Sequence, residues 1–367
     1  MNAILAERAA LPEGGTASVM AIVLLGTGVV GGALLQLLNT SAGGSLRLVG
    51  AANSRWQQTD PVRLARRNLR EQLDQQGDPR DDAGLLAALD ASGAAVKVIV
   101  DATASRALAS QHAAWLAHGH HVVTANKALA GGELAGWHAL QAALTGGARY
   151  GDSATVGAGL PVLSTLRRLR TCGDQLMLLE GVFSGSLSWL FNHYDGSRPF
   201  SDLLREARQL GYTEPDPRSD LSGEDVVRKL LILARTAGFA LGTDEVQVEG
   251  LVPASLQALN TETFLARLDE LDAPLAERHA AAASRGCVLR FLARLDRFGH
   301  ARVGLTEVPL GHPAARLHGT DNQFALTTTR YDSRPLVIQG PGAGPQVTAQ
   351  ALLGDVLALG GSRFGGS

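Results

Sequence analysis

A glycine-spaced turn between two apolar runs near the start of the chain constrains the fold most strongly. The run from Ser18 leads into Gly26, Gly28 and Gly31, and a second apolar run follows. This order predicts a buried strand, a tight turn at Gly26, an open approach for a pyrophosphate at Gly28 and close packing of a helix at Gly31. The expected phosphate-binding residues, at the start of that helix, are Gly26, Thr27, Gly28, Val29, Val30 and Gly31. A glycine-rich turn without a ligand is the alternative.

Polar residues follow the later strands that we expect in the same parallel sheet, at the edge where ligands bind. The second strand ends without the acidic residue usual in NAD-specific proteins, and Arg55 can meet a 2′-phosphate instead. We therefore expect NADP(H) to be preferred, with use of NAD(H) left open. The candidate cofactor contacts are Asn53, Ser54, Arg55, Thr103, Ser105, Thr124, Asn126 and Lys127. Asn126 and Lys127 could alternatively only start the next helix.

The stretch from Gly211 to Lys229 concentrates ionisable side chains beside two prolines. Gly211 ends the preceding helical run, and Pro215 and Pro217 prevent a helix between them. We expect Glu214 and Asp220 to lie on a stiff loop. Ser222 is the expected N-cap of the helix that follows.

Asp225 and Lys229 lie one turn apart on this predicted helix, at the border of its apolar face. A lysine there has its pKa lowered by burial, while a neighbouring carboxylate opposes that change, so Lys229 is a candidate for acid-base work. An ordinary ion pair that stabilises the helix is the alternative. The predicted solvent-facing stripe contains Glu224, Arg228 and Arg235.

The sequence pattern predicts an α/β chain with two domains. Residues 18–150, together with a returning segment at 331–367, form a Rossmann-type domain with a parallel sheet. Residues 151–330 form an α+β domain with a largely antiparallel sheet and a long helical region over about 255–285. Residues 1–17 are expected to be a flexible leader. The returning segment contains a glycine turn at 340–344 that could cap a ligand.

Composition excludes several classes of partner. The net charge is −2 and charged residues make up 19% of the chain, so no basic excess would attract nucleic acid or an anionic membrane. No apolar run approaches membrane-spanning length. Two cysteines are too few for a disulfide framework or a zinc site and fit a reducing cytoplasm, where we expect the protein to act.

From Met20 onward the chain resembles homoserine dehydrogenase, in particular the dehydrogenase half of the bifunctional aspartokinase-homoserine dehydrogenases. The resemblance rests on GTGVVGG, VDATAS, TANKALAG, ATVGAGLP, FSGSLSWLF and GPGAG, and most specifically on GYTEPDPRSDLSGEDVVRK. It implies NAD(P)H-dependent reduction of L-aspartate 4-semialdehyde to L-homoserine, in the route to threonine and methionine, by a homodimer.

The resemblance also implies roles for individual residues. Lys229 corresponds to the acid-base residue and Lys127 to a second lysine at the active site. Asp225 corresponds to the residue one turn before Lys229 that pairs with it. The corresponding substrate contacts are Glu214, Asp220, Asp225, Tyr212 and Ser186, and Gly342 lies in the glycine turn placed at the cofactor.

The sequence departs from the family pattern in two ways. Many members carry a glutamate that helps hold sodium or another monovalent cation, where this chain has Ser153. Backbone carbonyls of Val156, Ala158 and Leu160 could still supply hard oxygen ligands. No regulatory domain follows the closing helix in this sequence, so threonine feedback through one is not expected.

Two other functions stay open from sequence. A Rossmann oxidoreductase could act on another small amino aldehyde or hydroxy acid. A catalytically silent NADP-binding protein would keep the glycine turn and lose the lysines, and the presence of both Lys127 and Lys229 argues against it.

Overall fold

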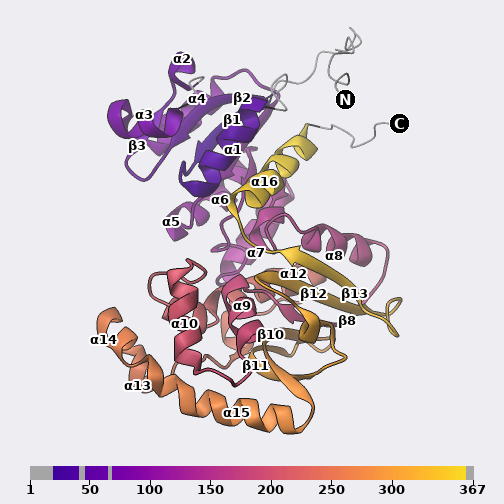
Figure 1. Cartoon of the computed structure of the whole chain (residues 1–367). Helices are drawn as coiled ribbons and strands as arrows, with labels where there is room; N and C mark the ends of the chain where they lie inside the picture. The colour runs from indigo at the N-terminus through magenta and orange to yellow at the C-terminus, as the bar shows by residue number, and fades with distance from the viewer. Residues whose placement is uncertain (1–19, 41–45, 65–67, 361–367) are drawn as a thin grey trace, which may run out of the picture.

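The computed structural model describes residues 20–40, 46–64 and 68–360, so the expected leader over 1–17 lies outside the described residues. A Rossmann-type domain lies above a second, sheet-based domain (Figure 1). This confirms the expected fold class, a mostly parallel sheet combined with a mostly antiparallel one. No helix within the described ranges is long and apolar enough to span a bilayer.

The first sheet has the order β4-β3-β2-β1-β5-β6-β7. Its parallel strands are β1 (Met20–Leu25), β2 (Leu46–Ala52), β5 (Val96–Asp101), β6 (His121–Thr124) and β7 (Tyr150–Gly151). Its antiparallel edge is β3 (Trp56–Gln58) and β4 (Asp78–Pro79). Side chains of β1 alternate between two apolar clusters, so both faces of the sheet are buried, as parallel sheets require.

Helices cover both faces of this sheet. One face packs against α1 (Val29–Thr40) and α16 (Pro345–Leu359), and the other packs against α4 (Asp82–Asp90), α6 (His112–Ala117) and α7 (Leu134–Leu144). Shorter helices lie at the edges of this domain: α2 (Pro61–Leu64), α3 (Leu69–Gln76) and α5 (Arg106–Ala109).

The second sheet has the order β13-β12-β8-β10-β11-β9 and is antiparallel except for the β9 and β11 pair. Its strands are β8 (Leu176–Val182), β9 (Val246–Val248), β10 (Cys287–Asp296), β11 (Ala301–Pro309), β12 (Asp321–Thr328) and β13 (Leu336–Pro341). One face packs on α8 (Val162–Thr171), α9 (Gly185–His193) and α12 (Glu224–Ala237). The opposite face carries a small cluster that includes Val182, Leu292 and Val308.

The helical region expected over about 255–285 is observed, and it consists of several helices. It is broken into α13 (Ala254–Gln257), α14 (Thr261–Ala266) and α15 (Asp272–Ser284). The side chain of Asn260 caps α14 by accepting the N–H of Thr263 at 2.8 Å, which starts a new helix there. Helix α15 runs along the lower edge of the second domain, and α10 (Phe200–Gln209) lies above it (Figure 1).

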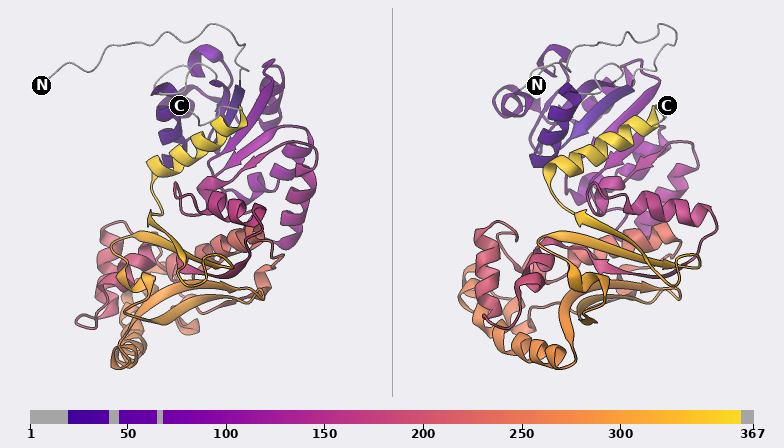
Figure 2. Two further views of the ribbon diagram at one scale, coloured as in Figure 1. Left: turned by 90° about the vertical axis from the view of Figure 1, so that its right-hand side faces the viewer. Right: turned by 45° about the vertical axis from the view of Figure 1, so that its right-hand side comes forward.

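The C-terminal segment divides between the two domains. Strand β13 pairs with β12 in the second sheet, which differs from its expected place in the Rossmann domain. Helix α16 returns to the Rossmann domain and lies along α1 (Figure 2). The glycine turn between β13 and α16 is therefore a crossing between the domains.

A second joint connects the segment after β6 to α12. A Cβ added to Gly131 would lie 2.6 Å from the carbonyl oxygen of Arg228, so only glycine permits this contact. Arg235 is 2% exposed and donates hydrogen bonds to the carbonyl oxygens of Leu241, Ala130 and Gly132. The prediction that Arg235 faces solvent is wrong, because backbone carbonyl oxygens of nearby loops surround its side chain at the end of α12.

We expect Arg235→Met to lower the free energy of unfolding by about 2–4 kcal/mol, because buried carbonyls would lose their donors. Arg228→Met is the matched control on the same helix. Its partner Glu224 lies 3.0 Å away in an exposed pair, so its loss should cost about 0.5 kcal/mol. Urea unfolding followed by circular dichroism measures both changes, and equal losses would contradict this role of Arg235.

Candidate active site

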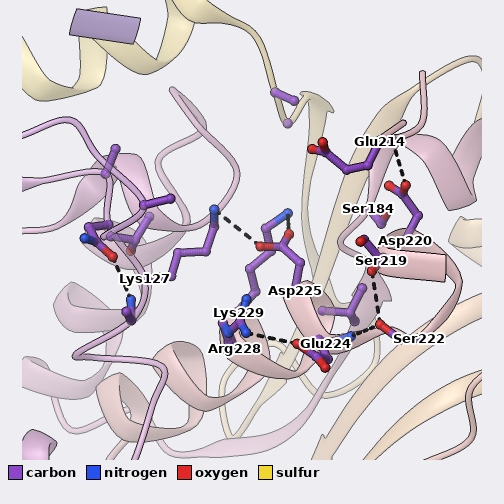
Figure 3. A pocket seen from close by; sticks show the side chains of 18 of the residues that line it. Lys127, Ser184, Glu214, Ser219, Asp220, Ser222, Glu224, Asp225, Arg228 and Lys229 are labelled. Carbon is purple, nitrogen blue, oxygen red and sulfur yellow. Dashed lines mark hydrogen bonds and ion pairs between the residues drawn. The ribbon is translucent and has the colours of Figure 1, made fainter. Parts of the chain in front are cut away.

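A cavity of about 1180 Å³ lies between the two domains, below the carboxyl ends of β5 and β6. The Rossmann side contributes Val30, Thr103, Asn126 and Lys127 to its wall. The facing side contributes residues from the segment before α12 and from α12 itself (Figure 3). The crossing at residues 342–344 closes a third side. The cavity therefore joins both groups of residues singled out from the sequence.

The segment before α12 differs from the predicted loop. Asp220 lies in a short helix, α11 (Arg218–Leu221), because Pro217 supplies a helical φ of −63° at its start. The N-cap of α12 is Gly223, with a φ of +76°, and not Ser222. A Cβ at Gly223 would lie 3.0 Å from the ring of Phe291, so glycine is needed there for space as well as for conformation.

Two lysines meet at one carboxylate on the cavity wall. The carboxylate of Asp225 lies 2.8 Å from Nζ of Lys229 and 3.4 Å from Nζ of Lys127, and the two lysines approach it from different domains (Figure 3). The sequence has only three lysines among its 33 basic residues, the third being Lys97. Arginine is always charged, whereas lysine exchanges its proton readily when it is buried, so this use of lysine favours acid-base chemistry.

Lys229 is held on two of its three N–H groups. It is 8% exposed and donates to the carboxylate of Asp225 and, at 2.7 Å, to the carbonyl oxygen of Phe183. Because an ammonium has three donors, one remains for a group in the cavity. The Phe183 carbonyl was not predicted from sequence, since any residue type could supply it.

Burial and neighbouring charges set the protonation of this cluster. Burial lowers the pKa of Lys229 below its ordinary value of 10.5, Asp225 opposes that change and Lys127 adds to it. Burial alone would raise the pKa of Asp225, but the two ammonium groups outweigh it and hold the pKa well below its usual range. The carboxylate therefore stays ionised, and Lys229 is the group whose proton is made more labile.

A second carboxylate group lies on the same side of the cavity. Asp220 accepts the hydroxyl of Ser186 at 2.7 Å and the backbone N–H of Glu214 at 2.9 Å. Burial raises the pKa of Asp220, and these hydrogen bonds oppose the change. The wall itself is formed by Ser184, Asp220 and Glu214, with Ser186 behind them. Tyr212 lies outside the wall, 5.5 Å from the ring of Trp189.

The glycine turn has the geometry of a phosphate site. Gly26 has a φ of +93°, and a Cβ at Gly31 would lie 1.8 Å from the carbonyl oxygen of Gly26. A Cβ at Gly28 would meet nothing within 4 Å, so the space in front of it is open to a ligand. Val29 is 66% exposed beside that space, and Thr27 is buried. A dinucleotide fits this turn.

The polar residues after β5 and β6 mainly brace one another. Asn126 donates to the carboxylate of Asp101 and to the carbonyl oxygen of Ser105, both at 2.9 Å. Thr103 and Thr124 likewise donate their hydroxyls to Asp101, to its carboxylate and its carbonyl oxygen respectively. Thr103 and Asn126 reach the cavity wall, whereas Ser105 and Thr124 do not. This bracing fixes the segment that carries Lys127.

Two charged residues near the end of β2 were missed from sequence. Asn53 donates to the carboxylate of Asp74 at 2.9 Å, and its carbonyl oxygen accepts Nη1 of Arg80 at 2.8 Å. Nη2 of Arg80 is buried and has no hydrogen-bond partner among the described residues. Both side chains lie more than twenty positions after Asn53, so no local signal in the sequence connects them to Arg55.

The two described carboxylates beside the expected cation site, those of Asp152 and Asp355, are both hydrogen-bonded. Ser153 donates both its N–H and its hydroxyl to Asp355 of α16, and Asp152 accepts Arg167 at 2.7 Å. The Leu160 carbonyl already accepts the N–H of Val162 at 2.8 Å. Within the described ranges no group of three or more metal-binding side chains occurs. Backbone carbonyls are therefore the candidate ligands for an ion here.

Family models cover most of the chain. The homoserine dehydrogenase model matches residues 161–357, and the model of the homoserine dehydrogenase NAD binding domain matches residues 26–150.

Known proteins give the same result. The bifunctional aspartokinase/homoserine dehydrogenase 2 of Zea mays is 39% identical over 93% of this chain, which spans only 38% of that relative's length. The homoserine dehydrogenase of Schizosaccharomyces pombe is 36% identical over 92% of this chain and 94% of its own. A Candida auris protein of unknown function superimposes with a TM-score of 0.86 at 33% identity, covering 93% of this chain and 98% of its own. The chain therefore belongs to the homoserine dehydrogenase family.

Proposed function

We propose that this chain reduces L-aspartate 4-semialdehyde to L-homoserine with NAD(P)H, in the route to threonine and methionine. The observation that carries the proposal is the position of Lys229. Lys229 lines a cavity whose opposite wall is the Rossmann domain, and two of its three N–H groups are already bonded. The substrate is inferred from the family to which the chain belongs. The side chains that line the cavity are of the types that could bind and protonate this substrate.

The arrangement supports proton transfer to an oxygen that becomes negative. NAD(P)H, when bound, would supply a hydride to the aldehyde carbon. Lys229 stabilises the developing negative charge with its free N–H and then donates that proton, which completes the alcohol. Asp225 holds the lysine in place, and Lys127 adds positive charge near the same carboxylate.

The carboxylates on the second wall fit the other end of an amino acid. Glu214 and Asp220 offer oxygen acceptors to a substrate ammonium group, and such charge-assisted bonds are strong and directional. Ser186 fixes Asp220 through its hydroxyl, so its support for the substrate is indirect. A contact from Tyr212 would require it to move from its place beside Trp189.

We further propose a preference for NADP(H), with NAD(H) also used. Arg55 is exposed at the end of β2, and Arg80 lies beside the same turn with an unpaired Nη2. Two guanidinium groups suit a 2′-phosphate. The carboxylate of Asp74 counts in the other direction, since an acid there suits ribose hydroxyls, although it is bonded to Asn53.

A monovalent cation at the carbonyls of Val156, Ala158 and Leu160 stays a proposal. Ala158 has a φ of 51° after Gly157 at 73°, so the backbone turns tightly at these two residues. Asp355 and Asp152 add negative charge nearby without being free ligands. Activity that is unchanged when sodium is replaced by a large organic cation would contradict it.

We propose a homodimer formed through the second domain. Strand β13 lies at the edge of its sheet, and Val337 on that strand is 39% exposed. Light scattering should give twice the mass of one chain, and the mass of a single chain would contradict this.

Action in the cytoplasm is likewise proposed, in agreement with the two unpaired cysteines, and cell fractionation tests it.

We expect Lys229→Ala to lower turnover by roughly 10²–10⁴-fold, the usual contribution of a positioned acid-base group. Reduction of NADP or NAD, followed at 340 nm with L-homoserine, measures turnover, and serine and threonine are the substrate controls. Fluorescence titration should show NADPH binding within about twofold of the parent.

Lys97→Ala is the matched variant for this experiment, because Lys97 pairs with Asp90 away from the cavity. It should keep full turnover. Near-normal turnover in Lys229→Ala would remove the acid-base assignment. If the parent reduces neither cofactor but still binds NADPH, the silent-binder function replaces the proposed one.

We expect Arg55→Ala to raise the KM for NADPH about tenfold while leaving the KM for NADH nearly unchanged. A lost charge-assisted bond to phosphate is worth roughly 1.5–3 kcal/mol, and 1.4 kcal/mol is tenfold. Steady-state kinetics with each cofactor measures the ratio. An unchanged preference between the two cofactors would count against the proposed NADP site.

A further inference from the structure

One backbone carbonyl near the cavity serves two buried donors. The oxygen of Phe183 accepts Nζ of Lys229 at 2.7 Å and Nδ2 of Asn322 at 3.0 Å. Asn322 lies on β12 and is 1% exposed. The lysine and the asparagine therefore share one acceptor, and the position of that oxygen depends on both.

The crossing between the domains rests directly on the same asparagine. A Cβ added to Gly342 would lie 2.1 Å from Cγ and Nδ2 of Asn322, so the backbone of the crossing touches the amide group. Gly342 also lines the cavity. Asn322 thus connects the segment that leads to α16 with the carbonyl that holds Lys229.

The amide of Asn322 is only half satisfied. Its Oδ1 is buried and has no hydrogen-bond partner among the described residues. An unpaired buried acceptor costs stability, and a leucine of similar volume would avoid that cost. Space filling therefore does not account for an amide here, whereas donation to the Phe183 carbonyl does.

The ring of Phe183 adds a second connection to β12. It stacks on the ring of Phe324, with centroids 4.6 Å apart and an interplanar angle of 21°. Phe324 lies two residues after Asn322, on the same face of the strand. The start of β12 therefore holds Phe183 by its ring and by its carbonyl.

We propose that Asn322 is a positioning residue for the acid-base lysine, fixing the Phe183 carbonyl so that the third N–H of Lys229 faces the substrate oxygen. This inference rests on the proposed function. The proposal also gives Gly342 a role. Its lack of a side chain lets the crossing pack against the amide of Asn322, which fixes the positions of the two domains on either side of Lys229.

A charge introduced at Asn322 should act on the lysine in a predictable direction. The charged groups that face Lys229 are Asp225 in α12, Lys127 after β6 and Asp220 in α11. A carboxylate in place of the amide would put a negative charge beside the oxygen that Nζ of Lys229 contacts, and a nearby opposite charge favours the charged form of the lysine. During reduction the ammonium is the active form, so activity falls as pH rises through the pKa of Lys229.

The test compares Asn322→Leu and Asn322→Asp in the full-length protein. We expect Asn322→Leu to lower kcat about tenfold, with the KM for L-aspartate 4-semialdehyde within about twofold. In Asn322→Asp the alkaline limb of the pH profile for the reduction should move to higher pH by about one unit. The pH dependence of Lys229 labelling by an amine-reactive probe, located by mass spectrometry, should move in the same direction without turnover.

Gln323→Leu is the matched control, because Gln323 is the next residue of β12, is also 1% exposed and also has an unpaired amide oxygen. It should leave the alkaline limb and the labelling profile in place. A kcat in Asn322→Leu within twofold of the parent, or an alkaline limb and labelling profile unmoved in Asn322→Asp, overturns the proposal. If Asn322→Asp loses thermal stability but its pH profile does not move, the proposal is also overturned. If the unsubstituted protein has no turnover, the proposed function is contradicted instead. The pH dependence of Lys229 labelling then still shows whether Asn322 acts on Lys229.

Discussion

The buried ammonium of Lys229 is the interaction on which the rest of the site depends. Removing an ammonium from water costs several kcal/mol, and the loss is offset only when the charge is paired and hydrogen-bonded. Here the compensation comes from Asp225 one turn earlier and from the Phe183 carbonyl at the end of β8. The position of the lysine therefore requires α12, the central strand of the second sheet and the segment after β6 to be in place together.

The domains meet through backbone contacts that leave little freedom. Gly131 lies against the carbonyl of Arg228, Arg235 binds the carbonyls of Ala130 and Gly132, and Gly342 lies against Asn322. Two of these contacts require a glycine, and the third is a buried guanidinium surrounded by carbonyl oxygens. Lys127 and Lys229 come from opposite sides of this joint, so their shared carboxylate would be lost if the joint opened. These contacts explain why side chains from the two domains can lie within hydrogen-bond distance of one another across the cavity.

Local patterns predicted most of the fold and both lysines, and long-range packing accounts for what they missed. The strand, turn and helix around Gly26 follow from steric rules that act within a few residues, and so does the end of α10 before Gly211, where φ is +75°. The wheel of α12 placed Lys229 correctly at a buried border. It misplaced Arg235 because acceptors from a distant loop, rather than water, surround that side chain. The cap is Gly223 and not Ser222, and the φ of +76° beside the ring of Phe291 suits a glycine at that position. The Phe183 carbonyl, Asn322, Arg80 and Asp355 gave no local signal, since each acquires its role only when distant strands and helices meet.

The balance of charges around Lys229 suits a reversible alcohol and aldehyde reaction. Reduction needs the ammonium as a proton donor, and oxidation of the alcohol needs the neutral amine as an acceptor. Burial and Lys127 lower the pKa of Lys229, while Asp225 raises it, so neither form is too stable to be reached. An arginine could not lose its proton, and an exposed lysine would keep it near neutral pH. The proposed proton transfer would account for two of the chain's three lysines around one carboxylate, whereas helix stabilisation alone would be served as well by any of the chain's many arginines.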